Sequence, residues 1–338
     1  MVYSEKQKLH ERQKKQKDGD LKTVVWDATN LCGMNCPHCY FRTFRHTQPI
    51  PLEKLEKAFS ELYDMGVSHF IFGGGEPIMD FERLEKMIEM AHPDESYINV
   101  LSNGWNMTPE MIQKLKELKV DKICFSLDSG IEEEHDKNRM LGSYKRVVEA
   151  VDNVMKAGLF ASVTAVPTHK SLYSEGFRKL IEYAKEKGVR LQIDIAMPVG
   201  EWDGRRDVLL TPEDTAYLKQ LSLDNITASD GHPIIKRDLY KPDGDRCRAG
   251  WETIYITVDG NVTPCVFLQY SLGNVADKSI KKMRDDLLKN KWFDGKHTKC
   301  LCGEDKEFFN KCIEPYVSRP KPLDAYEVFE LEKKNKIE

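Results

Sequence analysis

Short β-branched, apolar runs alternate with longer amphipathic stretches from residue 21 to about residue 200, and no other feature limits the fold of this chain as much. Apolar residues three or four positions apart are typical of helices, whereas short β-branched runs are typical of strands. Strands that alternate with helices build a parallel sheet with right-handed crossovers. The predicted strands cover 23–27, 69–72, 98–101, 122–126, 162–166 and 191–195, and the predicted helices cover 52–65, 81–91, 109–118, 143–157 and 176–187.

Six strand–helix repeats are fewer than the eight of a closed TIM barrel, so the sequence predicts an open, partial (β/α)6 TIM-like barrel of the α/β class. Local signals at the helix ends agree. Thr108 followed by Pro109 is a typical helix start. Glycine is common just past the end of a helix, and it follows three predicted helices at Gly66, Gly158 and Gly188. Ligands of parallel α/β folds collect at the carboxyl ends of the strands, and we expect the functional site there.

The pattern changes beyond residue 200, where the repeats give way to turn-rich segments and a β-hairpin. Two predicted strands, 253–258 and 261–265, flank Asp259-Gly260, a pair that favours a tight hairpin turn. A further helix is predicted from about residue 279. We therefore divide the chain into a polar N-terminal extension (1–20), a barrel core (21–225), a small cysteine-rich domain with a hairpin and a helix (226–320) and a charged, peripheral C-terminal tail (321–338).

Charge and composition argue against several classes of protein. The 51 Lys and Arg residues against 55 Asp and Glu residues give a net charge of −4, which argues against a general nucleic-acid binder. No apolar run approaches the roughly 18–20 residues that a transmembrane helix needs. The polar N-terminus is unlike a secretory signal. We expect a cytoplasmic protein, a monomer that binds neither nucleic acid nor a membrane.

The nine cysteines are unevenly placed. An odd number of thiols in a large chain without an export signal argues against a disulfide framework, and clustered thiols in a reducing compartment indicate metal sites. Cys124 stands alone inside a predicted strand, and we interpret it as a core thiol. The others form two groups, one of Cys32, Cys36 and Cys39 and one of Cys247, Cys265, Cys300, Cys302 and Cys312.

The first group has the spacing C-x3-C-x2-C and lies directly after the first predicted strand. Three thiolates on one short loop can hold three irons of a cubane cluster and leave the fourth iron without a protein ligand. A zinc loop with His38 as the fourth ligand is the alternative, but zinc sites usually combine a close pair of cysteines with a distant second pair. The spacing therefore favours an iron–sulfur cluster.

This loop resembles the signature of the radical SAM superfamily, in which C-x3-C-x2-C is usually followed by an aromatic residue, here Tyr40. The segment 73–77, Gly-Gly-Gly-Glu-Pro, follows the second predicted strand and resembles the GGE motif of that family. The segments 102–104 and 126–129 follow the next two strands and resemble its cofactor-lining motifs. The segment 135–139 resembles one whose arginine pairs with the cofactor carboxylate.

The resemblance implies that S-adenosylmethionine binds at the carboxyl ends of these strands, above a 4Fe–4S cluster on the cysteine loop. The amino group of the cofactor would lie against Glu76 and its carboxylate against Arg139, whose guanidinium suits a bidentate pair. On its own, Glu76 could equally be a surface residue of a glycine-rich turn. The implied cofactor-binding residues are Tyr40, Gly74, Gly75, Glu76, Ser102, Asn103, Ser126, Asp128 and Arg139.

The second cysteine group resembles the SPASM/Twitch domain that follows the barrel in part of this family. The shared order is a cysteine, a hairpin that ends in Pro-Cys, the segment Gly-Asn-Val, a helix and a cysteine cluster. Five cysteines are too few for the two clusters of a full SPASM domain. The resemblance therefore implies one auxiliary 4Fe–4S cluster, with a zinc ribbon as the alternative. Its implied ligands are Cys247, Cys265, Cys302 and Cys312, with Cys300 as an alternative because C-x-C is a tight spacing for two ligands of one cluster.

The resemblance implies an oxidoreductase that reductively cleaves S-adenosylmethionine to a 5′-deoxyadenosyl radical, which abstracts a hydrogen atom from the substrate. The auxiliary cluster would transfer electrons or handle substrate, and an electron donor such as flavodoxin or ferredoxin would serve the enzyme. A peptide or protein is the first substrate hypothesis, which makes the chain a maturase. A dehydrogenase or decarboxylase of an aminocyclitol, sugar or tetrapyrrole is the alternative, and a non-catalytic iron–sulfur electron carrier is a remote one.

Overall fold

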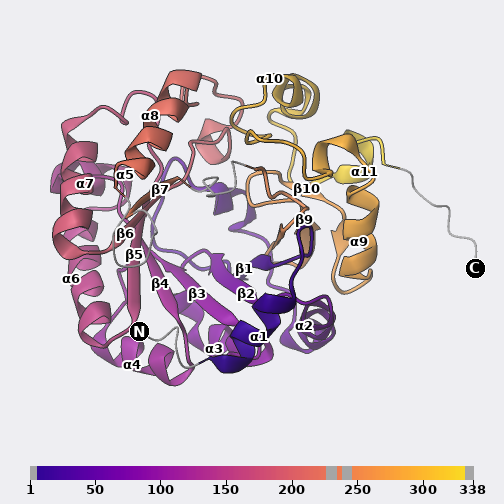
Figure 1. The fold of residues 1–338 in the computed structure, drawn as a ribbon, viewed down its shortest axis with the longest axis horizontal. Helices are drawn as coiled ribbons and strands as arrows, with labels where there is room; N and C mark the ends of the chain where they lie inside the picture. Colours follow the sequence, from indigo (N-terminus) through magenta and orange to yellow (C-terminus); the bar gives the residue numbers. More distant parts are fainter. Residues whose placement is uncertain (1–5, 226–233, 238–245, 332–338) are drawn as a thin grey trace, which may run out of the picture.

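The computed structural model describes residues 6–225, 234–237 and 246–331. Six parallel strands follow one another around an open barrel, and helices cover the outside of the sheet (Figure 1). The strands are β1 (Thr23–Thr29), β2 (His69–Gly74), β3 (Tyr97–Ser102), β4 (Lys122–Ser126), β5 (Phe160–Ala165) and β6 (Arg190–Ile193). The covering helices are α2 (Leu55–Asp64), α3 (Phe81–Met90), α4 (Pro109–Glu117), α6 (Ser143–Lys156), α7 (Glu175–Lys187) and α8 (Pro212–Leu223).

This architecture confirms the predicted partial barrel, and the predicted strands and helices agree with the observed ones to within three residues. The helix ends form for the reasons expected from the sequence. The side chain of Thr108 accepts a hydrogen bond from the backbone N–H of Met111 and so caps α4. Gly188 has a φ of +67° just past α7, in the left-handed region that favours glycine.

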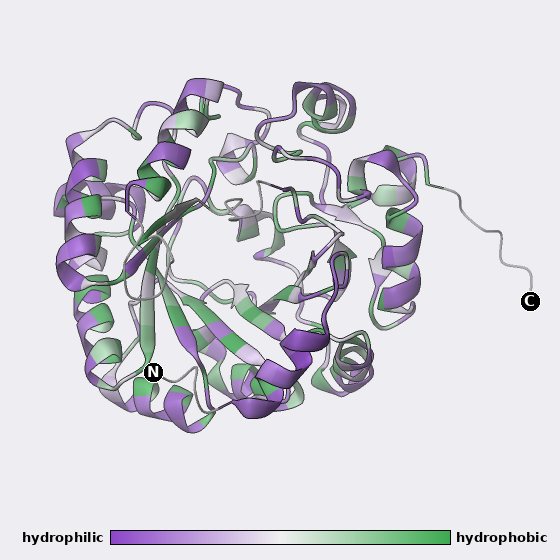
Figure 2. Cartoon of the chain, in the orientation of Figure 1, coloured by the Kyte–Doolittle hydropathy of each residue, from purple (hydrophilic) through white to green (hydrophobic). Residues whose placement is uncertain are grey.

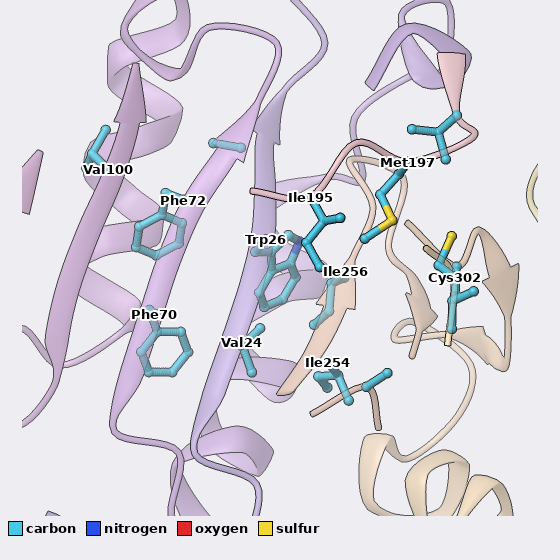
Figure 3. Packing of buried hydrophobic residues seen from close by; sticks show 14 of the residues in the cluster. Val24, Trp26, Phe70, Phe72, Val100, Ile195, Met197, Ile254, Ile256 and Cys302 are labelled. Carbon is cyan, nitrogen blue, oxygen red and sulfur yellow. The ribbon is translucent and has the colours of Figure 1, made fainter. Parts of the chain in front are cut away.

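The two faces of the sheet are set by the alternation of side chains along each strand. In β1, Trp26 points outward and stacks on Phe59 of α2, with 4.6 Å between the ring centroids. Figure 3 shows Trp26 with Phe72 and their neighbours in this outer core. Asp27, the next residue, therefore points into the barrel, where it meets Tyr255.

Apolar residues lie along the strands and on the sheet-facing sides of the surrounding helices, while polar residues face outward (Figure 2). This is the pattern that buries one face of each amphipathic helix. No helix of the described residues is both long and apolar enough to cross a membrane.

The polar N-terminal segment contains a helix that the sequence analysis did not predict, α1 (Gln7–Lys15). Lys6 anchors it: its Nζ donates to the backbone oxygens of Ser96 and Lys119 at 2.9 and 3.0 Å and pairs with Asp121. Ser96 precedes β3, and Asp121 precedes β4. The segment therefore packs against the amino ends of the strands, opposite the expected site.

The predicted hairpin is present, and it extends the barrel sheet. β8 (Thr253–Ile256) pairs parallel with β1 and antiparallel with β9 (Asn261–Thr263). On the other edge, β7 (Ile235–Arg237) pairs with β6. The described sheet runs in the order β11-β9-β8-β1-β2-β3-β4-β5-β6-β7, where β11 is Gly273–Asn274. The predicted boundary between residues 225 and 226 lies at the edge of the described residues, and the division into domains remains a prediction.

The cysteine-rich region gathers beside β9 and β1 (Figure 1). Its elements are β10 (Tyr270–Ser271), α9 (Ile280–Leu287), α10 (Lys306–Phe308), the π-helical turn η7 (Phe309–Ile313), β12 (Leu323–Asp324) and α11 (Ala325–Val328). One expectation is corrected here. The segment from residue 321 to 331 is not peripheral, because β12 pairs with β10 and the side chains of Leu323 and Phe329 are buried. Residues 332–338 of the predicted tail lie outside the described residues.

Candidate functional site

The three early cysteines lie on the loop that leaves the carboxyl end of β1. The Sγ atom of Cys32 accepts a hydrogen bond from the backbone N–H of Met34 at 3.5 Å and lies 4.0 Å from Nδ2 of Asn103. The Sγ atom of Cys36 lies 3.9 Å from a guanidinium nitrogen of Arg139. Asn103 follows β3, so the loop faces the carboxyl ends of the neighbouring strands, where the site was expected.

Burial raises the pKa values of two thiols in this loop. Burial raises the pKa of Cys39 to about 11, and the nearby charge of Cys36 adds to the shift. Burial also raises the pKa of Cys32. Bound iron would deprotonate these thiols, because the thiolate is the ligand.

No group of three or more His, Cys, Asp or Glu side chains among the described residues is arranged to hold a single metal ion. A cubane cluster makes a different demand, because its four irons hold the thiolates further apart than one ion does. Three thiols on one loop at the carboxyl ends of the strands are the donor set that such a cluster needs.

The glycine-rich turn after β2 is shaped by its contact with the start of the cysteine loop. Gly74 has a φ of +110°, and a Cβ atom there would lie 2.6 Å from the backbone oxygen of Thr29. A Cβ atom on Gly75 would lie 2.1 Å from the backbone oxygen of Leu31. Only glycine allows this close approach. The turn therefore packs directly against the backbone of the segment that leads into Cys32.

Glu76 is buried at the next position, and the carboxyl end of β3 holds its carboxylate. Its Oε1 accepts from the hydroxyl of Ser102 at 2.9 Å, and its Oε2 accepts from the backbone N–H of Asn103 at 2.7 Å. Burial raises the pKa of Glu76 to about 7, although these hydrogen bonds oppose the rise. The structure thus brings together Glu76, Ser102 and Asn103, three residues that the sequence predicts in the cofactor site.

Asp128 and Arg139 form a buried bidentate ion pair beside the cysteine loop. Nε and Nη2 of Arg139 donate to the two carboxylate oxygens of Asp128 at 2.7 and 2.9 Å. Burial alone would raise the pKa of Asp128, but the charge of Arg139 outweighs it and holds that pKa well below its ordinary range. Arg139 follows α5 (Glu132–Asn138), a second helix that the sequence analysis did not predict. Ser126 lies nearby at the end of β4, as predicted.

His38, the alternative zinc ligand, has a partner outside the loop. Its Nε2 lies 4.0 Å from the carboxylate of Asp128. Burial lowers the pKa of His38 to about 4, so the imidazole is neutral at physiological pH. A zinc site would require this ring to turn from Asp128 toward the three thiols.

Two residues that the sequence analysis missed, Arg83 and Asp27, hold the cysteine loop by hydrogen bonds. Nε and Nη2 of Arg83 in α3 donate to the backbone oxygens of Ala28 and Ile50 at 2.6 and 2.7 Å, and so tie together the two ends of the excursion that carries the cysteines. Asp27 accepts from the phenol of Tyr40 at 3.3 Å. An aspartate inside an apolar strand and an arginine on the buried side of a helix are the sequence signals that could have revealed them.

A backbone hydrogen bond and electrostatic influences connect four of the late cysteines, Cys247, Cys265, Cys300 and Cys302. The backbone N–H of Gly250 donates to the oxygen of Pro264 at 2.9 Å, which places the segment after Cys247 beside Cys265. The Sγ atom of Cys302 lies 3.9 Å from the backbone oxygen of Phe267. Burial raises the pKa of Cys302, and the charges of Cys265 and Cys247 raise it further.

The fourth neighbour of this group is Cys300. Burial raises its pKa first, followed by the charges of Cys247 and Cys302. Burial raises the pKa of Cys312 to about 11, and the next largest influences are the charges of Lys311 and Glu330. The choice between Cys300 and Cys312 as the fourth ligand stays a prediction.

Two family models match this chain. Residues 26–184 match the model of the radical SAM superfamily. The chain belongs to this superfamily. Residues 247–308 match SPASM, an iron–sulfur cluster-binding domain. The resemblance found in the sequence is thus confirmed: the protein is a radical SAM enzyme, whose cofactors are S-adenosylmethionine and a 4Fe–4S cluster, with an iron–sulfur cluster-binding domain after the barrel.

Known proteins with similar sequences have different substrates. An AdoMet-dependent heme synthase of Methanosarcina barkeri is 24% identical over 77% of this chain and 81% of its own length. A PqqA peptide cyclase of Ruegeria pomeroyi is 23% identical over 83% of this chain and 76% of its own length. The subtilosin biosynthesis protein AlbA of Bacillus subtilis is 24% identical over 79% of this chain and 60% of its own length.

Solved structures share the fold. SuiB of Streptococcus suis, bound to the precursor peptide SuiA, superposes with a TM-score of 0.64 and 17% identity over 96% of this chain and 78% of SuiB. The enzyme anSMEcpe with bound AdoMet superposes with a TM-score of 0.60 and 22% identity over 77% of this chain and 80% of its own. These likenesses support the fold of a partial barrel.

Proposed function

We propose that this radical SAM enzyme is a maturase that modifies a peptide or protein. The observation that carries the chemistry is the convergence of the cysteine loop, the buried Glu76 carboxylate and the Asp128–Arg139 pair at one end of the barrel. Electron transfer alone would need no such polar site beside the cluster loop. This convergence supports an enzyme over an electron carrier.

In this proposal Cys32, Cys36 and Cys39 hold the first cluster, and Glu76 accepts from the cofactor amino group. The bound cofactors supply one-electron cleavage of S-adenosylmethionine to methionine and a 5′-deoxyadenosyl radical, which takes one hydrogen atom from the substrate. The protein binds, orients and excludes water. Arg83 and Asp27 hold the loop from the side of the barrel sheet, and Arg139 sets the charge beside Cys36.

In this proposal the auxiliary cluster is held by Cys247, Cys265, Cys300 and Cys302, and the mutual electrostatic influence of these thiols supports that choice. Four thiolates complete the ligand set of one 4Fe–4S cluster. One auxiliary cluster therefore uses every late cysteine except Cys312.

The substrate class rests on relatives. The names of the PqqA peptide cyclase, of AlbA and of the mycofactocin maturase MftC indicate peptide modification, and SuiB is solved with a precursor peptide. A tetrapyrrole is the second candidate, because the AdoMet-dependent heme synthases match three quarters or more of this chain at 24% and 26% identity.

Anaerobic incubation of the reconstituted enzyme with dithionite and S-adenosylmethionine tests the proposal. We expect 5′-deoxyadenosine and methionine, and we expect a peptide library to show mass changes that depend on both the enzyme and the cofactor. Iron coproporphyrin III in a parallel reaction tests the second candidate. Turnover of the porphyrin with an unchanged peptide library would overturn the maturase assignment, and the absence of 5′-deoxyadenosine would overturn the radical mechanism.

A further inference from the structure

A cavity of about 220 Å³ lies between the cysteine loop, the segment after β6 and the SPASM region. On one side it is lined by Gly200, where a Cβ atom would lie 2.5 Å from the backbone oxygen of Cys39. On the other side it is lined by Cys302. Figure 3 shows Cys302 beside Met197, which follows β6, and a Cβ atom on the adjacent Gly303 would lie 3.1 Å from the sulfur of Met197. The cavity therefore lies between the two cysteine groups.

Lys321 brings a partly buried positive charge to this cavity. Its Nζ donates to the backbone oxygen of Tyr316 at 2.8 Å and lies 5.9 Å from the ring centroid of Tyr270. No carboxylate of the described residues lies within ion-pair distance of this nitrogen. An ammonium group has three N–H donors, so two remain for a ligand. A partly buried cation that lacks a carboxylate partner can gain from pairing with an anion, which makes this group a candidate anchor for one.

The other charged groups of the cavity already have partners. Arg319 lines the cavity and pairs with the exposed Glu327 at 3.2 Å. The carboxylate of Asp203 also lines the cavity, and it accepts from the backbone N–H of Ser318 at 2.8 Å. Lys321 is therefore the cation of the described lining that has no carboxylate within ion-pair distance.

The volume of the cavity limits the size of the ligand that it can hold. Pockets for drug-sized ligands measure roughly 300–1,000 Å³, so a cavity of about 220 Å³ admits a side chain or a chain end, not a whole macrocycle. The lining fits a short carbon chain that ends in a carboxylate, because Phe267, Ile313 and Val199 are apolar while Lys321 is cationic.

We propose that this cavity binds a carboxylate of the substrate, with Lys321 as its principal partner. The inference deepens the proposed function and rests on it only for the identity of the substrate. A glutamate side chain, a peptide C-terminus and a tetrapyrrole propionate share this chemistry. Anchored here, the substrate would lie beside Cys302 and within reach of the cysteine loop.

Differential acetylation of the full-length, cluster-loaded enzyme tests the site directly. Glutarate is the probe, glutaramide is its uncharged isostere, and mass spectrometry reads the acetylation of each lysine. We expect glutarate to protect Lys321 several-fold and glutaramide to leave it reactive. Lys311 is the matched control, since it lies in the same region but is exposed and pairs with Glu307. Equal reactivity of Lys321 with both probes would overturn the proposal.

Two substitutions extend the test by calorimetric titration with glutarate. Lys321→Gln is expected to weaken binding about tenfold, which corresponds to about 1.4 kcal/mol. Lys321→Arg keeps the positive charge and is expected to bind within about threefold of the wild type. Unchanged affinity in Lys321→Gln would place the anion elsewhere.

The same acetylation experiment identifies the source of the carboxylate when two candidate ligands are compared for their protection of Lys321. Stronger protection by N-acetyl-glutamyl-amide than by coproporphyrin III supports a peptide source, and the reverse order supports a tetrapyrrole source. The two proposals fail separately. Protection of Lys321 in an enzyme that modifies no peptide would remove the proposed function and leave the carboxylate site. Peptide modification with an unchanged KM in Lys321→Gln, together with no protection of Lys321 by glutarate, would remove the carboxylate site and leave the proposed function.

Discussion

The phenol of Tyr255 in β8 donates a hydrogen bond to the carboxylate of Asp27 in β1, deep inside the barrel. Tyr40, directly after Cys39, donates to the other oxygen of the same carboxylate at 3.3 Å. One side chain thus joins the first strand, the cysteine loop and the hairpin that leads to Cys265. Burial raises the pKa of Asp27 to about 8, against the opposing effect of the two phenols.

This raised pKa predicts a pH dependence of stability. The pKa of Asp27 in the folded state, about 8, lies above the ordinary value of about 3.9, so folding is favoured by protonation of this group. Its contribution is full below about pH 4 and is lost as the pH rises toward 8, at no more than about 1.4 kcal/mol per pH unit. Relative to Asp27→Asn, the thermal midpoint of the wild type should fall between pH 5 and pH 8. Asp277→Asn changes an exposed aspartate and serves as the control; a constant difference across this range would contradict the prediction.

The grouping of the late cysteines predicts different iron contents for two single variants. Cys300→Ala should lose the auxiliary cluster and keep about four irons, whereas Cys312→Ala should keep about eight. The reason is that, after burial, the charges of Cys247 and Cys302 have the largest influence on the pKa of Cys300, whereas those of Lys311 and Glu330 have the largest influence on that of Cys312. Iron and sulfide analysis after full reconstitution checks this, and the reverse pattern would restore Cys312 as the ligand.

Substitutions in the two cysteine groups should also affect different steps of the reaction. Cys32→Ala removes one ligand of the first cluster and should abolish formation of 5′-deoxyadenosine. Cys265→Ala, in the other group, should spare part of the cofactor cleavage and stop product formation. Chromatography of 5′-deoxyadenosine and mass spectrometry of the product measure the two steps, and equal loss of both in Cys265→Ala would argue against a separate role.

Arg83 is predicted to stabilise the cysteine loop by holding its two ends. Arg83→Met removes both hydrogen bonds, to Ala28 and to Ile50, and leaves two buried carbonyl groups without this donor, at a cost of about 1–3 kcal/mol. Release of iron from the first cluster to a chelator should become several-fold faster, with auxiliary iron unaffected. Lys86→Met, on the exposed side of the same helix, is the control. Equal release rates in the two variants would show that the loop does not depend on Arg83.

Glu61 in α2 caps α9, a helix of the cysteine-rich region that lies far from it in the sequence. Its carboxylate accepts from the backbone N–H groups of Ile280 and Lys281 at 3.0 and 3.1 Å, at the start of α9. Glu61→Ala should lower the free energy of unfolding by about 1–2 kcal/mol, because the helix loses a charged acceptor at its N-terminus. Hydrogen exchange of the α9 amides measures this. Lys57→Ala in the same helix should leave the α9 amides protected, and identical exchange in both variants would contradict the capping role.

The sequence alone predicted the barrel because its signals are local. Apolar periodicity, the Thr108 cap and the glycines after helices act within a few residues, so the strands and the covering helices could be placed before any contact was known. The same local rules missed α1 and α5, whose sequences are strongly polar. The segment that carries α1 is held by distant partners, such as the pairing of Lys6 with Asp121.

The candidate site likewise contains residues that the sequence predicted and residues that it missed. The spacing of Cys32, Cys36 and Cys39 and the turn before Glu76 are contiguous motifs, and the family assignment that they indicated was confirmed. Asp27 and Arg83 were missed because their partners lie elsewhere in the chain.

The residues themselves determined the partial barrel, the cysteine loop and the family. Only the tertiary structure decided that Lys321 lines a cavity beside Cys302 instead of facing solvent. The physical reason is the range of the interactions. Periodicity and motif spacing act along the backbone, whereas the neighbours of an ammonium group depend on how segments that are separated in the sequence pack together.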